Sequence, residues 1–197
     1  MARAGEGVLL LTGESTVYRY LPATDGAPFE IKPLGTYPFV APLEGEAFGS
    51  SAEKADVTRF SNLTQPNVST AQYTKMADAG VSGGLVAGGS PLGTDCSSLF
   101  IYRADQRVWR TTIEAGAFER WVDSGRDGAR ELLADERNIY IVTDDLGGIT
   151  AFAKSNGARR VIADGNFWGM AVDADGIYWG DHARDTGGTI FMAPRSP

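Results

Sequence analysis

The densest group of reactive side chains in this sequence is Asp181-His182 with Asp185, which contains the single histidine. A carboxylate beside an imidazole can exchange protons near neutral pH, and the same groups can bind a metal ion. No second histidine is present to complete a transition-metal site. A single histidine in an exposed loop is more often a side chain with no chemical role, so this group is a candidate site that the residue types alone do not establish.

The elements that position this group belong to a repeat. The segment Met170 to Asp181 reads as two short strands joined by a polar turn, and it aligns with Leu132 to Tyr140, 38 residues earlier. In that register Asp135 falls on Asp173, and Ile139-Tyr140 falls on Ile177-Tyr178. A strand repeat of about 40 residues is typical of a β-propeller blade.

Five β-branched residues mark the repeat along the whole chain. They are spaced by 40, 51, 41 and 41 residues, namely Val17, Val57, Val108, Ile149 and Ile190. The 25 glycines, many of them in short clusters, favour strands joined by tight turns. We therefore expect an all-β fold: a β-propeller of about five four-stranded blade-like units forming one partial domain over residues 1–197. The longest interval predicts an irregular insertion between blades at residues 61–98.

The ends of the predicted propeller are incomplete. Five second strands, five third strands, four first strands and four fourth strands can be identified, which gives 18. The first unit lacks an innermost strand before Val8, and the last lacks an outermost strand after Met192. Because unpaired strand edges and open blade faces favour association, we expect an incomplete or open ring that can self-associate through its end blades.

The connecting loops hold the candidate binding residues. In a propeller, the loops after the second and fourth strands lie on one rim. The ligand-binding candidates on this rim are Asp144, Asp145, Asp181, His182, Asp185 and Trp168. They could line an acidic funnel for a cation, a basic peptide or a carbohydrate. Tight turns also select Asp and Gly for local hydrogen bonding, whatever binds there.

The segment Ala171 to Asp181, AVDADGIYWGD, resembles the repeat of the six-bladed YWTD propellers of the low-density lipoprotein receptor type and of bacterial NHL-like propellers. A weaker copy, in which IVTD replaces YWTD, ends at Asp144. The resemblance implies six blades, an extracytoplasmic location, and a structural role for Asp144 and Asp181 in tying neighbouring blades together.

Two functions follow as hypotheses. The first is a non-enzymatic binding or scaffold module for a protein, peptide or carbohydrate, with no cofactor and no catalytic residue. It rests on the repeat architecture and on the absence of nucleophile and phosphate-binding motifs from the sequence. The alternative is a Ca²⁺-dependent hydrolase or lyase resembling gluconolactonase-type propellers. The candidate metal ligands for it are Glu14, Asp144 and Asp181.

The composition of the chain limits the classes of partner and the targeting segments that we expect. A net charge of -7 argues against binding to nucleic acid or to an anionic membrane surface. The apolar run Val8 to Leu11 is too short for a membrane span or a signal-peptide core, so we expect neither in this chain. Cys96 is the only cysteine and can form no intrachain disulfide. The bias toward Ala, Gly, Asp and Arg is typical of a bacterial protein.

Overall fold

The computed structural model describes residues 2–3, 9–13, 16–21, 30–36, 39–43, 46–50, 56–63, 69–75, 81–88, 98–103, 106–112, 118–125, 128–143, 148–181 and 188–195. Its side chains are described mainly from residue 98 onward, with short stretches at 41, 46–49 and 57–63. Every regular element within these residues is a β-strand, which confirms the all-β prediction.

The strands form five antiparallel sheets, which we number as blades one to five in chain order. The strands of the first three blades are β1 (Ala2–Arg3), β2 (Leu9–Gly13), β3 (Thr16–Leu21), β4 (Glu30–Thr36); β5 (Phe39–Leu43), β6 (Glu46–Ser50), β7 (Asp56–Ser61), β8 (Ser69–Lys75); and β9 (Val81–Gly88), β10 (Ser98–Arg103), β11 (Arg107–Thr112), β12 (Glu119–Asp123). Those of the last two are β13 (Ala129–Ala134), β14 (Asn138–Thr143), β15 (Gly148–Ala153), β16 (Arg159–Ala163); and β17 (Phe167–Val172), β18 (Gly176–Asp181), β19 (Ile190–Pro194).

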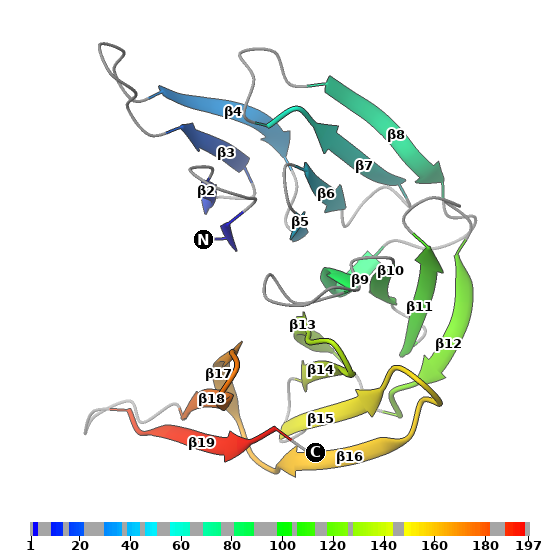
Figure 1. Ribbon diagram of the computed structural model, residues 1–197, viewed down its shortest axis with the longest axis vertical. Coiled ribbons are helices and arrows are strands. Elements are labelled where there is room, and N and C mark those ends of the chain that lie inside the picture. The colour runs from blue at the N-terminus through cyan, green and yellow to red at the C-terminus, as the bar shows by residue number, and fades with distance from the viewer. Residues whose placement is uncertain are drawn as a thin grey trace.

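The blades follow one another around an arc (Figure 1), with β5, β9, β13 and β17 nearest the centre and β4, β8, β12 and β16 outside. A gap in the arc separates the first blade from the fifth. In the part of the chain that is described, the first four blades have four strands each and the fifth has three. The fold is therefore an open β-propeller of five blade-like units, as the repeat predicted.

The prediction that the first unit lacks an innermost strand was wrong. Strand β1 fills this position, where Ala2 pairs with Leu10 and Arg3 with Leu9, so the described residues form 19 strands rather than 18. Two residues are too short to show the alternation of apolar and polar side chains by which strands are recognised in sequence. The fifth unit lacks a fourth strand among the described residues, as expected.

Two rim candidates lie in strands rather than in loops. Trp168 is the second residue of β17, and Asp181 is the last residue of β18. Phe167 and Asp181 form the end pair of the backbone ladder between these strands. Both strands therefore extend beyond the apolar residues from which they were predicted.

The predicted insertion at 61–98 contains two strands of the regular blades. These are β8 and β9, which include the positions expected for a fourth and a first strand. Residues 64–68, 76–80 and 89–97 lie outside the described part of the chain, so the extent of the insertion stays a prediction.

The core lies between blades. The described interface between blades three and four is a cluster that includes Phe100, Tyr102, Ile139 and Phe152. That between blades four and five includes Tyr140, Ile149, Phe167 and Ile177. Trp121 and Trp179 are partly buried against these two clusters. Burial of these large side chains between sheets is the main force that joins one blade to the next.

Candidate functional site

Among the rim candidates predicted from the sequence, Asp181 is the carboxylate whose surroundings the structure describes. Its Oδ1 accepts a hydrogen bond from the backbone N–H of Thr189 at 2.7 Å, and its own N–H donates to the Thr189 carbonyl at 3.1 Å. These two bonds join the end of β18 to the residue that precedes β19. The side chain of Asp181 therefore closes the loop between these strands, within its own blade.

The other members of the predicted rim group cannot be placed around Asp181. Asp144, Asp145, His182, Asp185 and Glu14 lie outside the described residues, and only the backbone of Trp168 is described. Across the part of the chain that is described, no three His, Cys, Asp or Glu side chains lie together in a group that could hold a metal ion. The Ca²⁺ site of Glu14, Asp144 and Asp181 stays a prediction.

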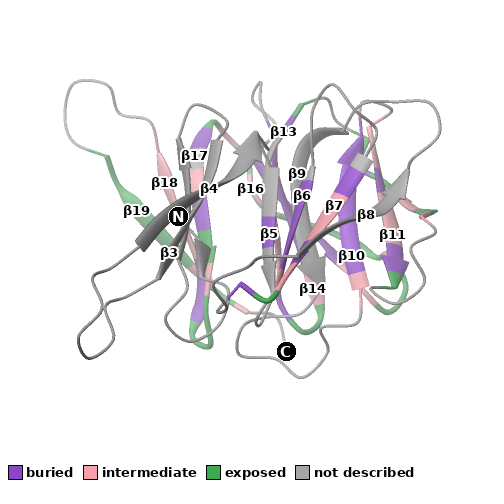
Figure 2. Cartoon of the chain, turned by 90° about the horizontal axis from the view of Figure 1, so that it is seen from above, coloured by how far each residue is buried: buried purple, intermediate pink, exposed green. Residues whose placement is uncertain are grey.

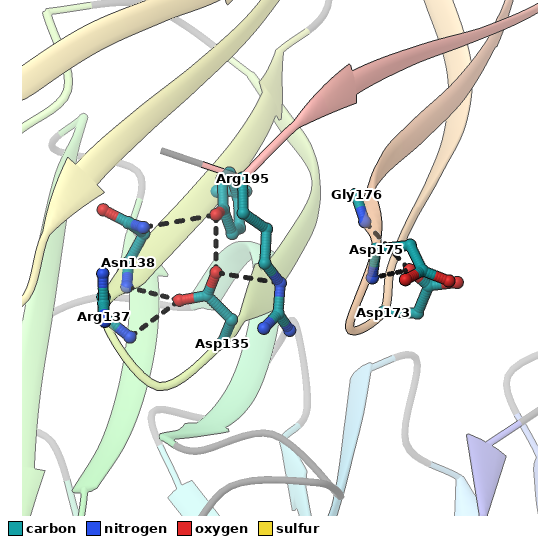
Figure 3. Close-up of polar contacts among 8 residues, drawn as sticks. Asp135, Arg137, Asn138, Asp173, Asp175, Gly176 and Arg195 are labelled. Atoms are coloured by element: carbon teal, nitrogen blue, oxygen red, sulfur yellow. Dashed lines mark hydrogen bonds and ion pairs between the residues drawn. The ribbon is translucent and has the colours of Figure 1, made fainter. Parts of the chain in front are cut away.

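A second polar cluster lies at the opposite end of the blades. Since neighbouring strands are antiparallel, the turns after first and third strands lie at one end and those after second and fourth strands at the other. The turn between β13 and β14 contains Asp135, a residue that is 3% exposed. Its Oδ1 accepts the backbone N–H groups of Arg137 and Asn138, each at 2.7 Å. Figure 3 shows these contacts, with Arg195 beside Asp135.

The other carboxylate oxygen of Asp135 joins two blades. Tyr140 of β14 donates its hydroxyl hydrogen to Asp135 Oδ2 at 2.6 Å. Arg195, the residue after β19, places its Nε 3.8 Å from the same oxygen. The cluster of Asp135, Tyr140 and Arg195 therefore connects blade four to the end of blade five through an ion pair that is longer than a hydrogen bond.

Tyr140 acts in this cluster as a hydrogen-bond donor. Burial, followed by the hydrogen bond and charge of Asp135, raises the pKa of Tyr140 far above its ordinary value. The phenol therefore keeps its proton at any physiological pH. This arrangement favours a structural role over an acid–base role.

Blade five repeats the turn without the cation. Asp173 Oδ1 accepts the backbone N–H groups of Asp175 at 2.8 Å and Gly176 at 3.0 Å (Figure 3). The carboxylates of Asp173 and Asp175 lie near Tyr178, and the pKa of Tyr178 is raised by desolvation and by these two charges. The described residues place no cation beside this pair.

The face of blade five that points away from blade four is apolar and open. Ile190 is 80% exposed and Met192 is 57% exposed, and both lie on β19. In Figure 2 much of β19 is green, at the margin of the molecule, whereas the strands of the middle blades contain long purple stretches. Large apolar side chains gathered on an exposed face are typical of an interaction surface.

Sequence reasoning had aligned Asp135 with Asp173 and Tyr140 with Tyr178 but gave these residues no role. A signal for the cluster was present in the basic residues Lys154 and Arg195, which lie 41 residues apart, one blade period. The open face could not be inferred from side-chain type, because the equivalent positions in blade four carry similar apolar residues.

Within the described residues, no helix is long and apolar enough to cross a membrane. No protein-family model and no curated protein matches the sequence.

Three solved structures resemble the chain in fold. A chain in the crystal structure of a nidogen–laminin complex has a TM-score of 0.64 at 16% identity, over 88% of this chain and 70% of that one. A structural genomics protein of unknown function from Bacteroides thetaiotaomicron has a TM-score of 0.63 at 12% identity, over 90% and 50%. The structure of U3-55K has a TM-score of 0.67 at 10% identity, over 95% and 58%.

These identities are low, so the likeness concerns the fold alone. The chain spans 70%, 50% and 58% of the lengths of these three similar chains.

Proposed function

We propose that this chain is a non-enzymatic binding module that presents the loop rim of its blades to a protein, peptide or carbohydrate. The observation that supports this proposal best is the hydrogen bond that the Asp181 carboxylate accepts from the Thr189 N–H at 2.7 Å. This bond joins the two ends of the loop between β18 and β19. A loop end held in this way offers a preorganised surface, which lowers the entropy lost on binding.

We further propose that the module is of the YWTD-like or NHL-like type. The segment from Ala171 to Asp181 supports this assignment, since Asp173 begins its polar turn and Asp181 ends its second strand. One detail differs from the expectation raised by the resemblance: the hydrogen bond of Asp181 to Thr189 lies within its own blade rather than between blades.

Among the three ligand classes, a protein partner has the best support. One of the similar structures is of a complex between two proteins, nidogen and laminin. The open apolar face of blade five points to the same class of partner, because such faces bind other folded chains more readily than sugars.

The test is a binding screen of the full chain against a panel of immobilised proteins, peptides and glycans, with three variants. Asp181→Asn keeps an acceptor for the Thr189 N–H, whereas Asp181→Ala removes it. Glu119→Gln removes a charge from an exposed residue of β12 and is the control. We expect saturable binding by the wild type, Asp181→Asn and Glu119→Gln, and affinity lower by about tenfold in Asp181→Ala because the bond that joins Asp181 to Thr189 is lost.

Two results would overturn the proposal. One is a failure to bind any member of the panel saturably. The other is Ca²⁺-dependent turnover of lactones or esters that Asp181→Asn abolishes, which would make the carboxylate a metal ligand.

A further inference from the structure

The outer strand of blade four, β16, is an exposed sheet edge. The order of the strands in this blade is β13-β14-β15-β16, so among the described strands β16 pairs with β15 alone. It lies on the outside of the arc (Figure 1). Its first three residues, Arg159, Arg160 and Val161, are all exposed. An edge strand of this kind carries backbone groups that can pair with a strand from another polypeptide.

The register of β15 and β16 shows which backbone groups of the edge point outward. The Ala153 N–H donates to the Ala158 carbonyl at 2.9 Å, which starts the ladder at a hydrogen-bonded pair. The next three pairs are Phe152 with Arg159, Ala151 with Arg160 and Thr150 with Val161. Hydrogen-bonded and non-hydrogen-bonded pairs alternate along an antiparallel ladder. The backbone N–H and C=O groups of Arg159 and Val161 therefore point away from β15, toward the position of an added strand.

The two arginines of this edge are not neutralised within the part of the chain that the structure describes. Neither guanidinium has a hydrogen bond or an ion pair there. Consecutive residues of a strand project to opposite faces, so Arg159 and Arg160 place a charge on each side of the edge. Strand β16 contains no acidic residue and has a formal charge of +2, in a chain whose net charge is -7. The edge therefore attracts a negatively charged partner.

The equivalent strand of blade three differs in this respect. In blade three Arg110 lies opposite Glu119, and their charged groups are 2.7 Å apart. One blade later, 41 residues along the chain, the same two positions are occupied by Ala151 and Arg160. The other two described arginines of β11 and β12 both pair with Asp123. The uncompensated charge of β16 is therefore a feature of blade four and not of the outer strands in general.

Val161 adds an apolar contact to this edge. It is 43% exposed and follows the two arginines directly. A strand added beside β16 places one residue opposite each of these three, and cross-strand pairs of opposite charge or of two apolar residues stabilise a sheet. The matching segment is extended, with two neighbouring acidic residues opposite Arg159 and Arg160 and an apolar residue opposite Val161. Main-chain pairing then supplies affinity and the side chains supply specificity.

We propose that the β16 edge binds an extended acidic segment of a partner protein, which adds a fifth strand to blade four. A protein segment fits better than nucleic acid or an anionic membrane, because the net charge of -7 repels an extended polyanion. In addition, only a polypeptide can pair with the outward backbone groups. This surface goes beyond the proposed rim site and is separate from it, because Arg159 follows the turn after a third strand, at the opposite end of the blade.

The test measures the binding of labelled peptides to the full chain by fluorescence anisotropy. The probe is a short peptide of Thr and Val with two adjacent Glu residues at its centre. One comparison peptide replaces both Glu residues by Gln, and another keeps them but is N-methylated along its backbone, so that it cannot form a ladder. We expect the wild type to bind the Glu peptide saturably and each comparison peptide at least about tenfold more weakly.

Two double variants locate the site. Arg159→Gln with Arg160→Gln removes the charge of the edge, whereas Arg107→Gln with Arg120→Gln removes the same charge from blade three and is the control. We expect the first to weaken binding of the Glu peptide by about tenfold and the second to leave it within about twofold. Equal losses in the two double variants would show attraction to the overall charge and would overturn the β16 site.

Amide hydrogen exchange tests strand addition itself. Because the N–H groups of Arg159 and Val161 point outward, their exchange should slow by about tenfold or more when the Glu peptide is bound. The N–H of Arg160 faces β15 and should change less. Unchanged exchange at Arg159 and Val161 with the peptide bound would overturn strand addition.

Three further results would overturn the proposal. The first is no saturable binding of the Glu peptide by the wild type. The second is equal affinity for the Glu peptide and either comparison peptide. The third is tighter binding of oligodeoxythymidine or of phosphatidylserine vesicles than of the Glu peptide, lost when Arg159 and Arg160 are replaced, which would assign the edge to a polyanion. The rim screen depends on Asp181 and on no residue of β16, so the two proposals can fail independently.

Discussion

Tyr140 donates its hydroxyl hydrogen to Asp135 across 2.6 Å, and both side chains are buried in blade four. The aligned residues of blade five are Tyr178, which is partly exposed, and Asp173, which is exposed. One local motif is therefore present twice, once covered by a neighbouring blade and once uncovered. The comparison of the two copies separates what the motif contributes by itself from what the neighbouring blade adds.

We predict that Tyr140→Phe lowers the free energy of unfolding by about 1–3 kcal/mol, because it leaves an oxygen of the buried Asp135 without its donor. Tyr178→Phe, the matched control, should cost less than about 1 kcal/mol, since water can replace the lost donor at the open face. Urea denaturation followed by circular dichroism measures both. Equal losses in the two variants would contradict a special role for the buried pair.

Ile149 and Ile190 provide the same comparison for apolar packing. Ile149→Ala should lower the free energy of unfolding by about 2–5 kcal/mol, as expected when a buried side chain leaves a cavity. Ile190→Ala should change it by less than about 0.5 kcal/mol, because that side chain is already in water. Thermal or urea unfolding of the two variants checks this, and a large loss for Ile190→Ala would show that another surface covers it in solution.

The sequence was sufficient to predict the repeat because apolar pairs such as Ile139-Tyr140 and Ile177-Tyr178 recur at the blade period, each before a polar turn. It was insufficient at strand ends. The two-residue β1 has no alternation to detect, and Trp168 and Asp181 belong to strands through backbone pairing that side-chain type does not reveal. The turn-forming residues therefore predicted the order of the blades correctly, but they predicted the first and last residues of the strands only approximately.

The candidate site was less predictable for a physical reason. The partner of Asp135 is Arg195, which lies 60 residues away in the sequence and reaches it only because blade five packs on blade four. Likewise, Ile149 and Ile190 are the same residue type at the same position, and only their spatial neighbours make one buried and the other exposed. Contacts between blades depend on which blade lies against which in space. The sequence of one repeat does not contain that information.

Gly148, at the start of β15, should not tolerate a side chain. Its φ is +75°, and a Cβ at this position would collide with the backbone carbonyl of Ala163 in the neighbouring strand β16. We predict that Gly148→Ala lowers the free energy of unfolding by about 3 kcal/mol or more, through backbone strain and displacement of β16 together.

Gly125 provides the matched control for this clash. Its φ is +65°, but no atom lies within 4 Å of the position that a Cβ would take. Gly125→Ala should therefore cost only the backbone strain, about 1–2 kcal/mol. The difference between the two variants in urea denaturation measures the clash, and similar losses would show that β16 moves aside easily.

Glu131 should make stability depend on pH in a direction opposite to that of most carboxylates. Its Oε2 accepts a hydrogen bond from the backbone N–H of Met170 in blade five at 3.0 Å. Desolvation by burial outweighs this bond and raises the pKa of Glu131 above 4.5. The folded state then binds the proton more tightly than the unfolded state, so this group favours folding at low pH and loses that contribution as the pH rises through its folded pKa.

We therefore predict that the stability of the wild type, measured relative to Glu131→Gln, falls between pH 4 and pH 7. The amide of Gln keeps an acceptor for Met170 and never ionises, so the difference isolates the cost of the buried charge. Urea denaturation of both proteins at pH 4, 5, 6 and 7 gives the difference directly. A difference that stays constant, or that moves in favour of the wild type as the pH rises, would mean that the hydrogen bond to Met170 outweighs desolvation and that the charged carboxylate strengthens the contact between blades four and five.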